Sequence, residues 1–324
     1  EFVHFRKRLK EDGLEFLLSQ TVALHPEAKN EKEVQIDTTV QEKNISFPTD
    51  AKLAKKVIDN CIKIAEKENV AQRQTYKRVS KQLLRDAYFG HHPKRKKKAI
   101  MARKKLRTIG KRLVRELERK LPGEVLQQYA DEFEKYKKVL IQERGSKEKI
   151  YSLHEPQTAC IAKGKAHKAY EFGTKVAVTR GRKTGIISSI KRFAGNPHDS
   201  KTLEESLAQS QRVRTQVGGT RPTIASTDRG FRGVTQVVAR KRFRARAAIE
   251  PTISHLKRNH SLGLNFLKGV SGDVNNALLS GIGYNLKMRF NQIKAQIIHW
   301  LEFLIFVLAS VFLKINLKTQ KVGF

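Results

Sequence analysis

An isolated strand pattern constrains the fold of this chain more than any other feature. The segment EVQIDTTV (33–40) alternates, with Val34, Ile36, Thr38 and Val40 on one face and Gln35, Asp37 and Thr39 on the other. β-Branched residues dominate it, which predicts a β-strand. Asp is depleted from strands, so Asp37 is expected to have a partner or a function.

Helical patterns surround this strand. Residues 2–21 carry apolar side chains at helical spacing, and Thr49 or Asp50 can cap a helix. In that helix Leu53, Val57, Cys61 and Ile64 recur on one face. From 69 to 145 the pattern stays helical and strongly basic, and it includes the run KRKKK (94–98). Such a run is a solvated face or a phosphate contact, and the sequence leaves both open.

The spacing of the apolar residues changes again after residue 170, from helical to alternating or continuous. Apolar or alternating residues flank the turn RGRKTG (180–185), which predicts a β-hairpin. The segment GNPHDSKTLEESLAQS then predicts a turn, a cap at Asp199 or Ser200, and a helix. A short strand over 223–226 precedes Asp228, and a helix carries Glu250. A first strand, a hairpin and a crossover strand predict an α/β fold with a mixed sheet.

The charge of the chain limits its partners. Lys and Arg number 66 against 31 Asp and Glu, a formal charge of +35 spread from Arg6 to Lys321. This excess opposes compaction unless a polyanion offsets it, which favours a nucleic-acid partner. A generically basic ribosomal or nucleoid protein is the simpler alternative, but it does not need the acids described below.

Two other features argue against zinc and against a membrane. Cys61 and Cys160 are far apart and lack Cys/His ligand spacing, which fits a reducing cytosol. The apolar run FLIFVLASVFL (303–313) has 11 uncharged residues between Glu302 and Lys314, whereas a membrane span needs roughly 20. We therefore expect the apolar end of a buried helix and no membrane.

The helix that carries Glu250 also carries bases on the same face. Arg246 lies four residues before Glu250 and Lys257 lies seven after it, and both offsets fall on one side of a helix. One carboxylate between two cations suggests a site that meets a metal ion and a phosphate. A surface helix with ion pairs would show the same spacing.

Three acids can form a metal site if their elements adjoin. Asp37 lies on the first strand, Asp228 follows the strand at 223–226, and Glu250 lies on the helix. Carboxylates without nitrogen or sulfur ligands select Mg²⁺ or Mn²⁺, and the metal offsets their mutual repulsion. Two such ions, ~3.5–4 Å apart, activate a water or a 3′-hydroxyl and stabilise the leaving oxygen of a phosphodiester.

Several segments of the chain, in order, resemble the DDE transposases of bacterial insertion sequences, specifically the insertion-sequence-five superfamily. They are HFRKRL, DTTVQEKNISFPTDAKL, GNPHDSKTL, TDRGFRG and RARAAIEPTISHLKRNHSLGLNFLKG. The resemblance implies a ribonuclease H-like fold and a metal-binding, catalytic triad of Asp37, Asp228 and Glu250. It implies a transposase that cuts and joins double-stranded DNA, at transposon ends and target, with probably two Mg²⁺ ions.

The resemblance also implies roles for basic residues. The family signature Y-(2)-R-(3)-E-(6)-K falls on Phe243, Arg246, Glu250 and Lys257, with Phe243 in place of the tyrosine. Arg246 and Lys257 are expected to contact DNA near the cleaved phosphate. The neighbouring candidates for DNA binding are Arg229, Arg232, Arg244 and Arg258.

The expected organisation has three parts. Residues 1–32 are a remnant of an N-terminal helical DNA-binding region, 33–295 a ribonuclease H-like catalytic domain, and 296–324 an apolar C-terminal helix. A long, basic, mostly helical insertion after the first strand occupies about 50–145 of the catalytic domain. We expect a homo-oligomer on DNA in the bacterial cytoplasm, associated with the nucleoid.

The chain departs from the family pattern at two places. Only 21 residues separate Asp228 from Glu250, where similar proteins carry a longer segment, and the usual N-terminal helical region is missing. Both departures suggest a truncated copy. A DNA-binding remnant without catalytic activity is therefore the main alternative, and a host nuclease of the same fold is another.

Overall fold

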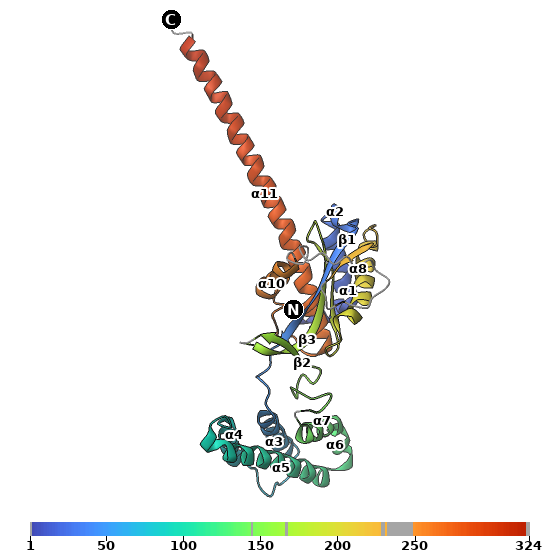
Figure 1. Cartoon of the computed structure of the whole chain (residues 1–324), viewed down its shortest axis with the longest axis vertical. Coiled ribbons are helices and arrows are strands. Elements are labelled where there is room, and N and C mark those ends of the chain that lie inside the picture. The colour runs from blue at the N-terminus through green and yellow to red at the C-terminus, as the bar shows by residue number, and fades with distance from the viewer. Residues whose placement is uncertain (1, 144, 166–167, 228–230, 232–248, 322–324) are drawn as a thin grey trace. The chain divides into compact units, whose positions relative to one another are not determined.

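The structure is a computed structural model that describes residues 2–143, 145–165, 168–227, 231 and 249–321 (Figure 1). These residues form two compact units. Unit 1 comprises Glu1–Gln41, Lys175–Phe193 and Pro197–Phe324, and unit 2 comprises Glu42–Thr174 and Ala194–Asn196. The chain therefore passes from unit 1 to unit 2 near the end of its first strand, after Gln41. It returns to unit 1 at Lys175, within a later strand.

The strands are β1 (Glu33–Lys43), β2 (Ala159–Lys165), β3 (Lys168–Gly181), β4 (Ile187–Phe193), β5 (Ile224–Ser226) and β6 (Leu264–Asn265). The first helices are α1 (Phe2–Ala23), α2 (Pro26–Lys29), α3 (Asp50–Lys67), α4 (Lys77–Tyr88) and α5 (Lys96–Lys120). The later helices are α6 (Gly123–Gln128), α7 (Ala130–Ile141), α8 (Leu203–Thr215), α10 (Ile249–Asn259) and α11 (Gly269–Lys321). Two 3₁₀ turns, η1 (Pro93–Arg95) and η2 (Asp199–Thr202), complete the described elements. The α/β class predicted from the sequence is confirmed.

The mixed sheet is organised around β1. In the described residues its strand order is β2-β3-β1-β5, with β4 paired to β3 and β6 paired to β1. β3 and β4 are antiparallel, as predicted for the hairpin, and Gly185 in their turn has a φ of 72° that favours glycine. β5 pairs in parallel with β1, in a register that joins Gln35 to Ser226.

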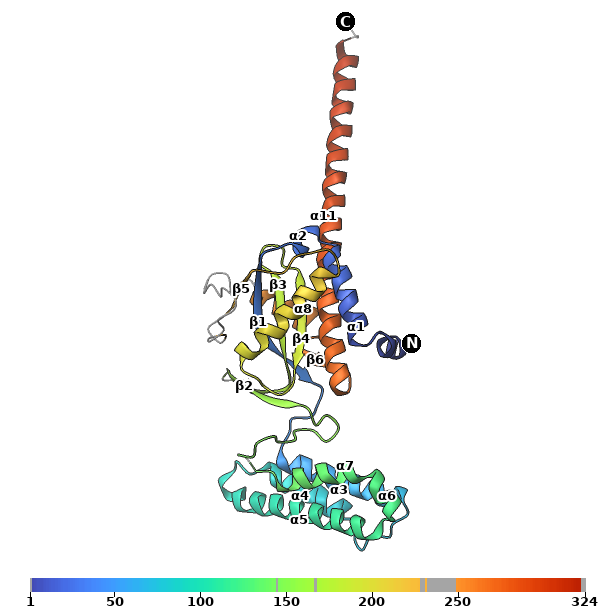
Figure 2. The same ribbon diagram turned by 90° about the vertical axis from the view of Figure 1, so that its right-hand side faces the viewer.

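Helices cover both faces of this sheet in unit 1. Figure 1 shows α10 on one side of the strands and α8 on the other. Val34, Gln35 and Ile36 are consequently all buried, although successive side chains of β1 point to opposite faces. Figure 2 shows α1, α8 and α11 beside β4, where their apolar side chains form one core.

A buried asparagine joins three elements of unit 1. Asn285 of α11 is fully buried, and its amide nitrogen donates to Thr21 Oγ1 at 2.9 Å and to the Ile187 carbonyl at 2.8 Å. Its Oδ1 accepts from the Ile187 N–H at 2.9 Å. One side chain thereby satisfies both backbone groups of a β4 residue and fixes α11 against α1.

Unit 2 contains the helices α3 to α7. Thr49 caps α3 by accepting from the Lys52 N–H, and the predicted face with Leu53, Val57 and Cys61 is buried. Burial raises the pKa of the Cys61 thiol to about 12, as expected for a structural cysteine. Both the predicted cap and the predicted buried face are confirmed.

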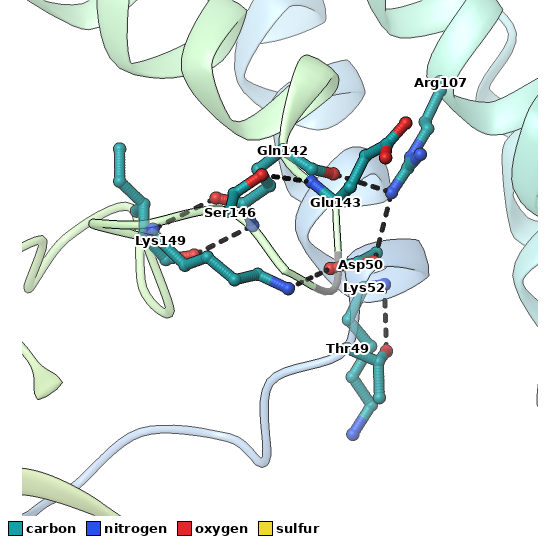
Figure 3. A network of polar contacts seen from close by, with 9 residues as sticks. Thr49, Asp50, Lys52, Arg107, Gln142, Glu143, Ser146 and Lys149 are labelled. Carbon is teal, nitrogen blue, oxygen red and sulfur yellow. Dashed lines mark hydrogen bonds and ion pairs between the residues drawn. The ribbon is translucent and has the colours of Figure 1, made fainter. Parts of the chain in front are cut away.

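Polar contacts close one end of this helical unit (Figure 3). Asp50, in the first turn of α3, accepts from Arg107 of α5 at 3.1 Å, and Lys149 lies 3.8 Å from its other oxygen. The Gln142 side chain pairs with both backbone groups of Ile150, at 3.0 and 3.1 Å. These contacts hold the segment after α7 against α3 and α5.

The prediction of a buried C-terminal helix is wrong. α11 is one continuous helix from Gly269, and the predicted boundary at 296 falls inside it. Its side chains from Phe303 to Leu308 are all exposed. Composition led to the error, because an apolar run indicates burial without saying what covers it. Among the described helices, α11 alone is long and apolar enough, over Gly269–Ser310, to cross a membrane by length and composition.

Replacing the buried asparagine should destabilise unit 1. In Asn285→Leu the Ile187 backbone groups and the Thr21 hydroxyl lose their partner, so we expect the free energy of unfolding to fall by about 2–4 kcal/mol. Asn291→Leu makes the same substitution at an exposed position of α11 and should change it by less than about 0.5 kcal/mol. Urea unfolding followed by circular dichroism measures both; equal stability of the two variants would contradict the assignment.

Candidate active site and basic surface

Asp37 lies near the middle of β1 and is half-buried. Its Oδ1 accepts from the Thr38 N–H at 2.7 Å, and the Thr38 hydroxyl donates to Asp199 at 2.8 Å. Because successive side chains of a strand point to opposite faces, Asp37 faces away from Thr38 and Asp199. The two acids therefore lie on different faces of the sheet.

Asp199 has a structural role that sequence reasoning missed. It is the first residue of η2, and its carboxylate accepts from Lys175 Nζ at 2.9 Å as well as from Thr38. The predicted cap at Asp199 or Ser200 is wrong, because the cap of η2 is His198. Burial raises the pKa of Asp199, but the hydrogen bonds from Lys175 and Thr38 lower it, and the net pKa lies below its usual value. Asp199 is therefore a charged anchor between β1 and β3.

The helix that carries Glu250 lies over the other face. Lys175 and Arg180 are five residues apart on β3, so their side chains leave the strand on opposite faces. Lys175 contacts Asp199, whereas Arg180 donates to the Thr252 hydroxyl of α10. Burial lowers the pKa of Arg180, but the ordinary pKa of arginine is so high that the side chain stays charged. Asp37 and α10 are therefore on the same face of the sheet.

α10 presents Glu250 and the basic residues away from the core. Its buried residues are Ile249, Thr252 and Leu256, whereas Glu250 and Arg258 are exposed and Lys257 is half-buried. Lys257 lies seven residues after Glu250, on the same side of the helix, as predicted. Glu250 lies in the first turn of the helix, where the helix dipole favours a negative charge.

β5 leads the chain toward the third predicted acid. Ser226, its last residue, lies opposite Gln35, and the Ser226 hydroxyl donates to Glu33 at 2.7 Å. The next acid along the chain is Asp228, which lies outside the described residues together with Phe243, Arg229, Arg232, Arg244 and Arg246. Within the described ranges, no group of three or more His, Cys, Asp or Glu side chains could hold a metal ion. The structure thus describes two of the three predicted acids.

A basic stripe runs along α5 in unit 2. Ala102, Leu106, Ile109, Leu113 and Leu117 bury one face of this helix. The opposite, exposed face carries Lys97, Lys104, Lys111, Arg115 and Arg119 at spacings of four or seven residues. The run 94–98 continues the exposed charge at the start of the helix. Sequence reasoning identified the basic segment but not the face on which its charges gather.

Comparison with known proteins adds a partial similarity. No protein-family model matches the chain, and no solved structure matches it. The curated protein named "Uncharacterized protein ORF8 in nfe locus", from Rhizobium meliloti, is 38% identical over 84 residues. The match covers 24% of this chain and 40% of that protein, so the chain spans less than half of the length of this relative. The similarity is too short to assign the chain to a family.

Proposed function

We propose that this chain is a DDE transposase that cleaves and joins DNA strands at the ends of a bacterial insertion sequence. The single observation that carries the proposal is the placement of Asp37 and the Glu250 helix on the same face of the sheet. The Arg180–Thr252 contact fixes that helix, and Asp199 occupies the other face. Two acids predicted from motifs 213 residues apart in sequence thus lie on elements of the same side of the sheet, Asp37 on β1 and Glu250 on α10.

The sheet also supports the finer fold proposal. The hairpin strand β3 and the parallel strand β5 lie on the two sides of β1 in the described sheet, which supports the ribonuclease H-like layout proposed from the motifs. The strands β1 and β5 are parallel, and their pairing ends at Gln35 and Ser226. Asp37 and Asp228 each follow that pair by two residues.

The donor set fits a hard divalent cation. Carboxylates of Asp37 and Glu250, joined by Asp228, are oxygen ligands of the kind that Mg²⁺ and Mn²⁺ prefer. Bound Mg²⁺, in a pair of ions, would lower the pKa of an attacking water or 3′-hydroxyl and stabilise the leaving oxygen. In this proposal Lys257, on the same side of α10 as Glu250, binds a DNA phosphate beside the reacting one. Arg180 and Asp199 position the elements without touching DNA.

The basic stripe of α5 supplies further binding energy in this proposal. Lys and Arg side chains bind phosphates without reading the base sequence, and such contacts fix a protein on the duplex. Its five charges lie at helical spacing along one exposed face. The chain would act on nucleoid DNA in the cytoplasm as a homo-oligomer.

A DNA-binding remnant without catalytic activity is the second candidate. The short segment between Asp228 and Glu250, only 21 residues, favours it. The remnant keeps the basic surface but lacks a working triad, so it binds DNA and cleaves none with any divalent ion.

Removal of either described acid should abolish cleavage. With Mg²⁺ or Mn²⁺ and a labelled duplex carrying the ends of the element, we expect strand cleavage by the wild-type chain. Asp37→Asn and Glu250→Gln should each reduce it at least about 100-fold, because even partners outside the first ligand shell contribute 10–100-fold. Glu204→Gln, in the exposed first turn of α8, removes the same charge elsewhere and should leave cleavage unchanged.

The possible results separate the two candidates. No cleavage by the wild-type chain with either ion, together with retained DNA binding, favours the remnant. Cleavage that survives both substitutions contradicts the assignment of the acids. A host nuclease would hydrolyse DNA without joining the labelled ends to a target plasmid.

Neutralising the basic stripe should weaken DNA binding and its salt dependence. In the triple variant Lys104→Gln, Lys111→Gln and Arg115→Gln, each lost phosphate contact lowers the slope of log affinity against log salt by about 0.9. We therefore expect a slope reduced by up to about 2.7 and uniformly weaker binding to unrelated duplexes. Fluorescence anisotropy between about 50 and 200 mM salt measures both.

The matched control replaces three lysines that carboxylates already neutralise. Lys55, Lys77 and Lys137 pair with Asp59, Glu66 and Glu118. Their substitution by Gln should change the slope far less than the stripe variant does. Equal slopes for the two triple variants would show that overall charge, and not the α5 stripe, determines binding.

A further inference from the structure

The outer part of α11, residues 286–310, has apolar side chains that the rest of the structure does not cover. Phe290 is 58% exposed, Trp300 61% and Phe306 70%. Figure 1 shows this part of α11 continuing past the sheet of unit 1. Monomeric proteins rarely expose contiguous apolar patches larger than a few hundred Å², and larger ones mark interaction sites.

The apolar residues of this segment follow a coiled-coil spacing. One stripe contains Leu286, Phe290, Ile293, Ile297, Leu301, Leu304 and Leu308, at steps of four, three, four, four, three and four residues. The single repeated step of four is a stutter, which locally unwinds a coiled coil without ending it. The sequence continues the pattern at Val311 and Ile315. The opposite side carries the polar residues Gln292, His299 and Glu302 and, in its second half, the exposed apolar residues Phe303, Ile305 and Phe306.

The pattern fits another helix better than it fits a lipid bilayer. A membrane span needs roughly 20 apolar residues, but the uncharged run here is limited to 11 residues by Glu302 and Lys314. A carboxylate near the middle of a span is costly, and Gln296 and His299 add polar groups to the same length. Apolar residues at alternating steps of three and four, sustained over about three heptads, are instead typical of a coiled coil.

The stripe offers apolar area to a partner. Its seven side chains are each 39–60% exposed, and Trp300, which flanks it, is 61% exposed. Taking about 150–250 Å² for a whole large apolar side chain, they expose on the order of 600 Å² per copy, somewhat below the about 800 Å² per partner of a standard interface.

We infer that the outer part of α11 pairs with the same segment of a second copy of this chain through the Leu286–Leu308 stripe. Knobs from one stripe enter holes of the other, while Gln292, His299 and Glu302 remain in water. This pairing does not rest on the proposed catalytic function. It assigns the exposed end of α11 as the dimerisation element of the protein.

The full-length chain tests this inference directly. Size-exclusion chromatography with multi-angle light scattering, without DNA or detergent, should give twice the monomer mass. Ile297→Glu with Leu304→Glu places two charges in the stripe and should give the monomer mass. Gln292→Glu with His299→Glu adds two acids to the opposite side and should leave the dimer intact.

Two other measurements keep the test decisive. Far-ultraviolet circular dichroism should show an unchanged fold in both variants, since these residues lie outside the core of unit 1. Flotation with vesicles of anionic and zwitterionic phospholipids tests the membrane alternative. Three results would overturn the inference. The wild-type chain could be a monomer, the dimer could survive the stripe substitutions, or the chain could float with vesicles in a way that the stripe substitutions abolish.

Discussion

The alternation of side chains along β1 determines how the rest of unit 1 is arranged. Adjacent residues of this strand face two different helical layers. Thr38 donates to Asp199, the first residue of η2, and Asp37 faces the layer that contains α10. β3 repeats the division with Lys175 and Arg180, each joined to a different layer. A shift of β1 by one residue would exchange the two faces and turn Asp37 toward the layer that contains η2 and α8.

Electrostatic balance differs between the two faces. On one face Asp199 is neutralised by Lys175, and its lowered pKa shows that the folded state favours the charged carboxylate. On the other face Glu250 is exposed beside Lys257 and Arg258, in a chain of charge +35. A carboxylate among basic side chains favours cations, and the basic side chains favour phosphate groups; the DNA-cleaving site that we propose would require both.

Local patterns predicted most of the fold, because its main elements have local signals. The strand at 33–40, the hairpin around 180–185 and the cap at Thr49 were all predicted from adjacent residues. The role of Asp199 could not be predicted in this way, since its partners Thr38 and Lys175 are 161 and 24 residues away. The motif GNPHDSKTL did mark the segment that contains Asp199. Only the folded sheet shows that the Asp199 carboxylate binds Thr38 and Lys175.

The exposure of the outer part of α11 could not be predicted either, for a different reason. Apolar composition indicates that a helix prefers to leave water, but the covering surface can belong to the same chain, a second copy or a membrane. In the first part of α11 the cover is intramolecular: Ala277, Leu278 and Ile282 pack in the core of unit 1, and Asn285 adds a satisfied hydrogen-bond network to that contact. Met288 still packs against that core, and beyond it the apolar side chains of α11 are exposed. The contact of α11 with unit 1 therefore ends about one turn after Asn285, well before the apolar run near the C-terminus that drew attention in the sequence.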